Sequence, residues 1–497
     1  MSLISTRGGD SVTASQAILK GLAHNGGLYV PSVFPKVDRE LLLKLPGMTY
    51  IERASAILST YLDDFSVQEI DAALRAAYAV DKFDDAAIAP LRRLNGNTHV
   101  LELFHGPTLA FKDMALQLLP HLTVLSAHKN GEKREISILV ATSGDTGKAA
   151  LEGFKDVPGT SCTVFYPADG VSDVQRLQMT TTGGSNTHVI AVNGNFDDAQ
   201  TGVKQLFASG EFASRMDERG KALSSANSIN FGRLVPQIVY YFSAYADLIA
   251  QGAIEPGDAV NFVVPTGNFG NILAAYYARC MGLPVHKLIC ASNRNNVLTD
   301  FFTSGEYDSR RTFYKTTSPS MDILVSSNLE RLLFEACGRG SDTVAEWMRQ
   351  LREGGRYDIG CERLAWMREV FAAGCADDAQ TAEEIRRVWE QEHYLMDTHT
   401  AVASHVLAAY RDATQDATPT VIVSTASPYK FAGDVLAALK NQQAVSDCDA
   451  FACSETLERL TGVPVPEQVR ALREQPVRHH ARCEKDAMAQ AVLDCCR

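Results

Sequence analysis

No stretch of this 497-residue sequence is apolar enough to cross a bilayer, and no CxxC pair occurs in it. The eleven cysteines are scattered singly, apart from Cys495 and Cys496, which favours reduced thiols in a cytosolic setting over a disulfide framework or a zinc site. The opening MSLISTRGGDSVTASQ has neither the apolar core of a secretory signal nor an Arg-rich amphipathic stretch. We therefore expect a cytoplasmic protein that does not contact a membrane.

The sequence also lacks an excess of positively charged residues. The 47 basic and 59 acidic residues give a net charge of −12. A nucleic-acid-binding protein needs a basic surface to displace counterions, so we exclude that class of function. A few local cations can still hold a small anionic substrate.

Short β-rich runs alternate with helical stretches along most of the chain. Each run has four to six apolar residues bounded by Gly, Pro, Ser or Asn, which is typical of buried parallel strands. The clearest runs are 99–104, 136–141, 162–167, 188–192, 260–265, 286–291 and 420–425. Residues 11–90, 327–395 and the charged tail after about 455 have mainly helical spacing. The pattern indicates an α/β protein with open parallel sheets, in which ligands bind at the carboxyl ends of strands.

Two of the predicted strands end in turns rich in glycine that lead into a helix. One turn spans residues 142–147 of ILVATSGDTGKAALEGF, and the other contains Gly267 and Gly270 in VVPTGNFGNILAAYY. Backbone N–H groups and the positive end of a helix would favour a carboxylate or a phosphate at either turn. Many strand-to-helix turns are rich in glycine without binding anything, so each turn alone is weak support.

Lys112 lies where the loop HGPTLAFKD passes into an amphipathic helix. One interpretation is a solvated lysine at a helix start, which is the usual fate of a lysine. The other is an amine whose pKa falls in a partly apolar pocket, which would make it nucleophilic towards an aldehyde. The spacing of residues does not decide between them.

Seven ordered motifs resemble those of the threonine synthases. The motifs are HGPTLAFKD, ATSGDTG, NSINFGR, PTGNFGN, SPSMDILVSSNLERLLFE, MDTHTAVA and VSTASPYKF, preceded by STRG and GLAHNGGLYVP. The resemblance spans residues 4–435 and is greatest to the long form found in bacteria and fungi. It implies the tryptophan-synthase-β-like fold, which is fold type II among pyridoxal-phosphate (PLP) enzymes. We then expect a mainly helical domain at 1–92, a catalytic region at 93–455 with a smaller subdomain at about 112–215, and a helical appendage at 456–497.

The resemblance also implies the residues around the cofactor. Lys112 matches the lysine that holds PLP as a Schiff base. Thr425, with Ser424 as the alternative, matches the hydroxyl that faces the pyridine nitrogen. Asp145 matches a residue near the phenolic oxygen, although many relatives on the wider fold carry Asn there, and an ionised Asp cannot donate a hydrogen bond. The loop around the cofactor phosphate is matched by Gly267, Asn268, Phe269, Gly270 and Asn271.

The substrate site is implied in the same way. Ser143 and Thr146, with Asp145, match the loop around the substrate's carboxylate. The segment that binds the substrate's phosphate and carboxylate is matched by Asn227, Ser228, Asn230 and Arg233. Arg233 suits phosphate because its planar fork binds two oxygens at once; its other interpretation is a helix-start residue with a capping role. The sequence departs from the family pattern at Asn25 and Thr398, where Asp and Pro are usual.

The implied reaction converts O-phospho-L-homoserine and water to L-threonine and phosphate, the last step of threonine biosynthesis. The freed Lys112 amine would move protons at the substrate's carbons, phosphate would leave from Cγ, and water would add at Cβ. No metal is expected, because His and Cys lack ligand spacing. Two alternatives stay open: a phospho-lyase that releases 2-oxobutyrate, and a non-catalytic binding protein of the same fold. A monomer or a homodimer is expected.

Overall fold

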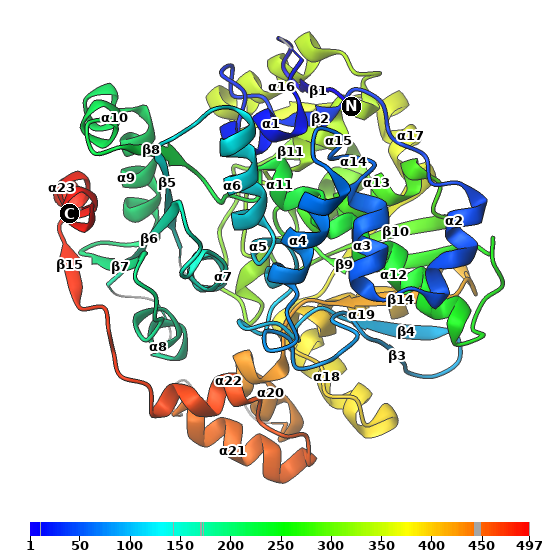
Figure 1. Ribbon diagram of the computed structural model, residues 1–497. Helices are drawn as coiled ribbons and strands as arrows, with labels where there is room; N and C mark the ends of the chain where they lie inside the picture. The colour runs from blue at the N-terminus through cyan, green and yellow to red at the C-terminus, as the bar shows by residue number, and fades with distance from the viewer. Residues whose placement is uncertain (10, 143, 169–170, 172, 442–448, 497) are drawn as a thin grey trace.

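Two β-sheets with helices on both faces form the computed structural model (Figure 1). The structure describes residues 1–9, 11–142, 144–168, 171, 173–441 and 449–496. Within these residues no helix has the length and apolar composition that a membrane span requires. Nine cysteine thiols are free in the same residues, whereas Cys453 is disulfide-bonded, so the prediction of reduced thiols is wrong at that position.

The larger sheet has the strand order β13-β10-β9-β14-β4-β3, and every neighbouring pair is parallel except β3–β4. Along β9, Phe262 and Val264 face one core while Val263 faces a second core on the opposite side. Because side chains alternate along a strand, this pattern buries both faces of the sheet. The strands are β3 (Leu91–Arg93), β4 (Thr98–Glu102), β9 (Val260–Pro265), β10 (Val285–Ser292), β13 (Phe371–Cys375) and β14 (Thr420–Ser424).

Helices α12 and α13 pack against this sheet on one side, and α19 lies against β9, β10, β13 and β14. A short antiparallel pair, β11 (Glu306–Asp308) and β12 (Arg356–Asp358), lies beside them. The helices of this part are α5 (Asp113–Leu116), α11 (Phe231–Leu234), α12 (Pro236–Ala250), α13 (Gly270–Met281), α14 (Val297–Ser304), α15 (Leu329–Ala336), α16 (Ser341–Gly354), α17 (Cys361–Val370), α18 (Asp378–Glu392), α19 (Thr398–Thr414) and α20 (Ala432–Leu439).

The smaller sheet has the order β15-β7-β6-β5-β8, and all its pairs are parallel. It lies to the left in Figure 1, apart from the larger sheet. Its strands are β5 (Glu135–Ala141), β6 (Thr160–Pro167), β7 (Thr187–Val192), β8 (Lys221–Ser224) and β15 (Ala481–Cys483). Its helices are α6 (Leu119–Lys129), α7 (Asp145–Phe154), α8 (Asp173–Thr180), α9 (Phe196–Ala208) and α10 (Gly210–Asp217).

The N-terminal segment packs directly on the larger part. It contains the antiparallel pair β1 (Leu3–Ser5) and β2 (Tyr29–Pro31), and helices α1 (Ala14–Lys20), α2 (Arg39–Lys44), α3 (Tyr50–Leu58) and α4 (Val67–Ala77). Capping boxes begin α1, α3 and α4, which fixes where these helices start. One apolar core continues from α3 and α4 into the larger sheet, so the division at residue 92 stays a prediction.

The tail differs from the expected helical appendage. It contains α21 (Ala450–Thr461), α22 (Glu467–Arg470) and α23 (Met488–Cys495), but between them β15 pairs with β7 at the edge of the smaller sheet. Met488, Val492 and Leu493 of α23 share a core with β6 and β7. The three residues of β15 have no apolar alternation, so the sequence pattern did not indicate a strand there.

Candidate active site

Lys112 stands at the start of α5, in a loop that leaves the carboxyl end of β4. The carboxylate of Asp113 folds back on this loop and accepts hydrogen bonds from the backbone N–H of Thr108 at 2.8 Å and its hydroxyl at 2.7 Å. The N–H of Phe111 donates to the carbonyl of Thr425 at 2.9 Å, at the end of β14. These bonds fix the backbone that carries the Lys112 side chain.

The Lys112 ammonium is nearly buried and only loosely held. Its Nζ lies 3.4 Å from Asp145 Oδ2 and 3.4 Å from Ser320 Oγ. Burial lowers the pKa of Lys112; Asp145 opposes the shift, whereas the charges of Lys430 and Arg233 add to it. A larger fraction of this amine is therefore neutral near pH 7 than of an ordinary lysine, and the neutral form is the nucleophile.

Asp145 lies between two ammonium groups. Lys430 Nζ forms an ion pair with Asp145 Oδ1 at 2.9 Å and donates to the carbonyl of Thr108 at 2.8 Å. Burial alone would raise the pKa of the Asp145 carboxyl, but the charges of Lys430 and Lys112 outweigh it and hold the pKa well below its usual range. Asp145 is therefore an ionised acceptor that ties α7 of the smaller sheet to residues of the larger part.

The backbone of Ser320 is hydrogen-bonded to a histidine side chain. Its N–H donates to His399 Nε2 at 3.1 Å, so the ring proton is on Nδ1, which donates to Asp397 Oδ1 at 3.0 Å. Asp397 is also the N-cap of α19. The sequence analysis assigned no role to His399, Ser320 or Lys430. Ser320 and Lys430 lie inside two of the family motifs, SPSMD and SPYKF. Their place in these motifs was the one signal in the sequence that could have identified them.

The glycine turn after β9 lies beside Ser320. A Cβ at Gly267 would come within 2.6 Å of the Ser320 carbonyl, so the close approach requires glycine there. Phe269 has a left-handed φ of 64° and precedes α13, whose first turn has no side-chain cap. Asn268 contributes its carbonyl, which accepts from the N–H and the side-chain amide of Asn328, each at 3.0 Å.

Amide donors surround the start of α13. A Cβ at Gly270 would meet no backbone and would lie 3.5 Å from Asn328 Nδ2 and 3.8 Å from Gln237 Nε2. Asn271 accepts hydrogen bonds from Tyr240 and Tyr241 at 2.7 and 2.6 Å, while its buried Nδ2 has no partner in the described part of the chain. Uncapped N–H groups and an orphaned amide donor suit a bound anion.

The two hydroxyls at the end of β14 have different surroundings. Ser424 Oγ is hydrogen-bonded to Thr400 Oγ1 at 2.9 Å. Thr425 is buried, and its hydroxyl has no hydrogen-bond partner among the described residues. Thr425 is thus the hydroxyl that is available to a ligand, which favours it over Ser424.

Arg233 lies in α11 as a buried cation. Its Nη1 donates to the Ala226 carbonyl at 3.0 Å, and its buried Nε has no partner within the described residues. Burial lowers the pKa of Arg233 to about 10. Among the described residues no carboxylate forms an ion pair with Arg233. The positive charge of Arg233 contributes to the lowered pKa of Lys112. A buried guanidinium without a counter-ion suits an anionic ligand.

The other residues predicted to bind substrate differ from one another in burial and in hydrogen bonding. Asn230 caps α11 through its Oδ1 and donates to the Ile18 carbonyl at 3.0 Å, so the protein itself uses this side chain. Asn227 is exposed, and Ser228 and Thr146 are half-buried. Ser143 lies outside the described residues. The assignment of these residues to the substrate stays a prediction.

Comparison with known proteins places the chain in a family. Three family models match it: the threonine synthase N terminus at residues 2–78, the pyridoxal-phosphate-dependent enzyme model at 87–426, and the threonine synthase C-terminal model at 400–490. A threonine synthase from Pseudomonas aeruginosa is 44% identical over 87% of this chain and 89% of its own length. The chain belongs to the threonine synthase family.

Other members of the threonine synthase family resemble the chain over different shares of their length. The human protein named threonine synthase-like 1 is 42% identical over 86% of this chain, which spans only 58% of that relative. The PLP-bound threonine synthase from Brucella melitensis has a TM-score of 0.89 at 38% identity over 100% of both chains. The yeast threonine synthase has a TM-score of 0.87 at 31% identity over 99% of this chain and 98% of its own.

The fold type II architecture expected for a PLP enzyme of the threonine synthase family is thereby confirmed, and the site suits the cofactor. The uncapped N–H groups at the start of α13 and the orphaned Asn271 amide fit a phosphate. The Lys112 amine of lowered pKa fits an aldehyde, and the free Thr425 hydroxyl fits a ring nitrogen.

Proposed function

We propose that this chain is a threonine synthase that converts O-phospho-L-homoserine and water to L-threonine and phosphate with PLP. The observation that carries the proposal is the pairing of a buried amine of lowered pKa, Lys112, with a buried guanidinium that lacks a counter-ion, Arg233. The first suits an aldehyde cofactor, and the second suits the phosphate of the substrate.

Bound PLP supplies an aldehyde for amino groups and a conjugated ring that withdraws electrons from the substrate's carbons. The cofactor-binding residues would be Lys112, Asp145, Gly267, Asn268, Phe269, Gly270, Asn271 and Thr425. The Lys112 Nζ would remove one proton from Cα and one from Cβ of the substrate, and it would return protons to Cγ and to Cα. Asp145 and Ser320, each 3.4 Å from Nζ, would keep that amine directed at the substrate.

Arg233 would hold the phosphate that leaves from Cγ, with Ser228 beside it. The buried guanidinium offers N–H donors in one plane, so it can bind two phosphate oxygens together and stabilise the charge that develops as the bond breaks. Ser143, Thr146, Asn227 and Asn230 complete the proposed substrate site. We also propose that the protein works in the cytoplasm as a monomer or a homodimer.

A product assay tests this function. Purified protein loaded with PLP should release phosphate from O-phosphohomoserine and form L-threonine in equal amount. A phospho-lyase that releases 2-oxobutyrate is the second candidate, because it would use the same site residues. Equal amounts of phosphate and 2-oxobutyrate would establish that candidate instead, and no phosphate release would contradict both.

A further inference from the structure

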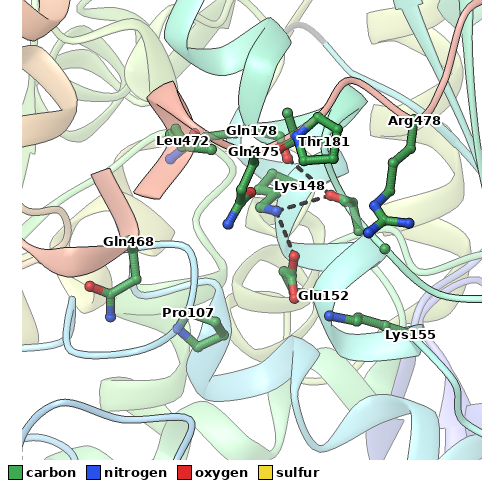
Figure 2. Close-up of a pocket in the computed structure, with 13 residues that line it drawn as sticks. Pro107, Lys148, Glu152, Lys155, Gln178, Thr181, Gln468, Leu472, Gln475 and Arg478 are labelled. Carbon is green, nitrogen blue, oxygen red and sulfur yellow. Dashed lines mark hydrogen bonds and ion pairs between the residues drawn. The ribbon is translucent and has the colours of Figure 1, made fainter. Parts of the chain in front are cut away.

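A cavity lies away from Lys112, between the smaller sheet's helices and the C-terminal arm, which we define as residues 462–480 between α21 and β15. Its volume is about 370 Å³, and α7, α8 and the arm supply most of its lining (Figure 2). The arm is fixed to the end of α8, because the N–H groups of Arg478 and His479 donate to the Thr180 carbonyl at 2.8 and 3.1 Å. Both walls of the cavity are therefore well defined.

The cavity has a surplus of positive charge. The nearly buried Lys148 is neutralised inside the wall, since its Nζ contacts Glu152 Oε1 at 2.5 Å and Thr182 Oγ1 at 2.9 Å. Lys155 and Arg478 also line the cavity and are exposed to solvent, and neither has an ion-pair partner in the part of the chain that the structure describes. Two uncompensated charges thus face one small space.

The neutral lining is made of hydrogen-bonding groups. Gln178 is only 3% exposed and lines the cavity. Gln468 and Gln475 of the arm add two further amides. Each of these amides can donate to the oxygens of a ligand and accept from its hydroxyls.

We propose that this cavity binds a small organic dianion, either a dicarboxylate or a phosphate monoester. The two free cations match a ligand charge of −2, and the amides match carboxylate or phosphate oxygens and the hydroxyls that such molecules carry. The lining leaves little apolar surface for a drug-like ligand. Because α7 begins at Asp145, the ligand would brace the same helix that contributes a carboxylate to the active site.

Isothermal titration of the PLP-loaded protein with succinate and with glycerol 3-phosphate tests this site. At least one of the two should bind, with an affinity that falls as salt is added. Lys155→Gln and Arg478→Gln should each weaken binding about tenfold or more, because each removes a charge-assisted bond. Binding of succinate alone or of the phosphate ester alone would identify which kind of dianion fits.

Two control variants separate this site from surface charge and from the active site. Arg473→Gln removes a cation of the same arm that pairs with Glu455 at 3.1 Å outside the cavity, and it should keep the wild-type affinity. Arg233→Ala should also keep it. The proposal is wrong if neither anion binds, if Arg473→Gln weakens binding as much as Arg478→Gln, or if Arg233→Ala abolishes it.

Discussion

Replacing Lys430 with methionine is the most direct test of the electrostatics around Lys112. The change keeps the length of the side chain and removes its charge, so Asp145 retains Lys112 as its remaining ammonium partner. The charge of Lys430 disfavours the protonated form of Lys112. Without Lys430, the Asp145 carboxylate stabilises only the Lys112 ammonium. Both effects favour the protonated amine, so the pKa of Lys112 should rise in Lys430→Met.

The size of the shift follows from the geometry. Both nitrogens contact one carboxylate, at 2.9 and 3.4 Å. They therefore lie within about 9 Å of each other, where two unit charges repel by about 2 kcal/mol at an effective dielectric constant of about 20. Since one pKa unit corresponds to about 1.4 kcal/mol, we expect the pKa of Lys112 to rise by about one unit. Loss of a buried ion pair should also lower the free energy of unfolding by about 3 kcal/mol.

The assay is the rate at which the apo-protein captures PLP, followed by visible absorbance as a function of pH. Only neutral Lys112 reacts, so capture is slow at pH values below the pKa of Lys112. This acidic part of the rate–pH curve, the acid limb, should move about one pH unit upwards in Lys430→Met. Lys430→Arg keeps the charge and should leave the limb in place, as should Lys440→Met, which changes an exposed lysine of the same region. An unmoved limb in folded Lys430→Met would refute the argument.

Lys112→Ala should lose the visible absorbance band of the loaded protein and nearly all turnover; a surviving band would put the cofactor on another amine. Gly270→Val should fold but retain PLP weakly, because its side chain would crowd the uncapped start of α13, whereas Gly267→Val should lose stability through its clash with the Ser320 carbonyl. Equal PLP affinity in wild type and Gly270→Val would place the phosphate elsewhere. Arg233→Ala should spare the band and lower kcat/KM for O-phosphohomoserine about thirtyfold to hundredfold, with weaker inhibition by phosphate. Arg233→Lys should recover part of that loss, and wild-type kinetics in Arg233→Ala would favour a capping role.

The seven strands predicted from apolar runs are all present, as β4, β5, β6, β7, β9, β10 and β14. They were visible because a strand buried on both faces must be apolar along its whole length. Edge and short strands escaped the same reasoning. β8 begins with Lys221 and β15 contains Arg482, and neither has a periodicity that separates it from a loop.

The resemblance identified Lys112, the glycine turn and Arg233. It did not identify the neighbouring group Lys430, which shifts the pKa of Lys112. Lys430 and Lys112 are far apart in sequence and meet only because Asp145 of the other sheet lies between them. His399 is similar, since its role depends on the backbone N–H of Ser320. Contacts of this kind leave no local pattern, because each partner is ordinary in its own segment.

The pairing of β15 with β7 has a consequence for how the protein is made. Residues 187–192 leave the ribosome long before residues 481–483, so the edge of β7 has no neighbour for most of synthesis. An open strand edge of this kind can pair with another chain. A segment that is synthesised much later therefore covers the edge of a sheet whose other strands lie in the first half of the chain, and until then that edge is open to pairing with other chains.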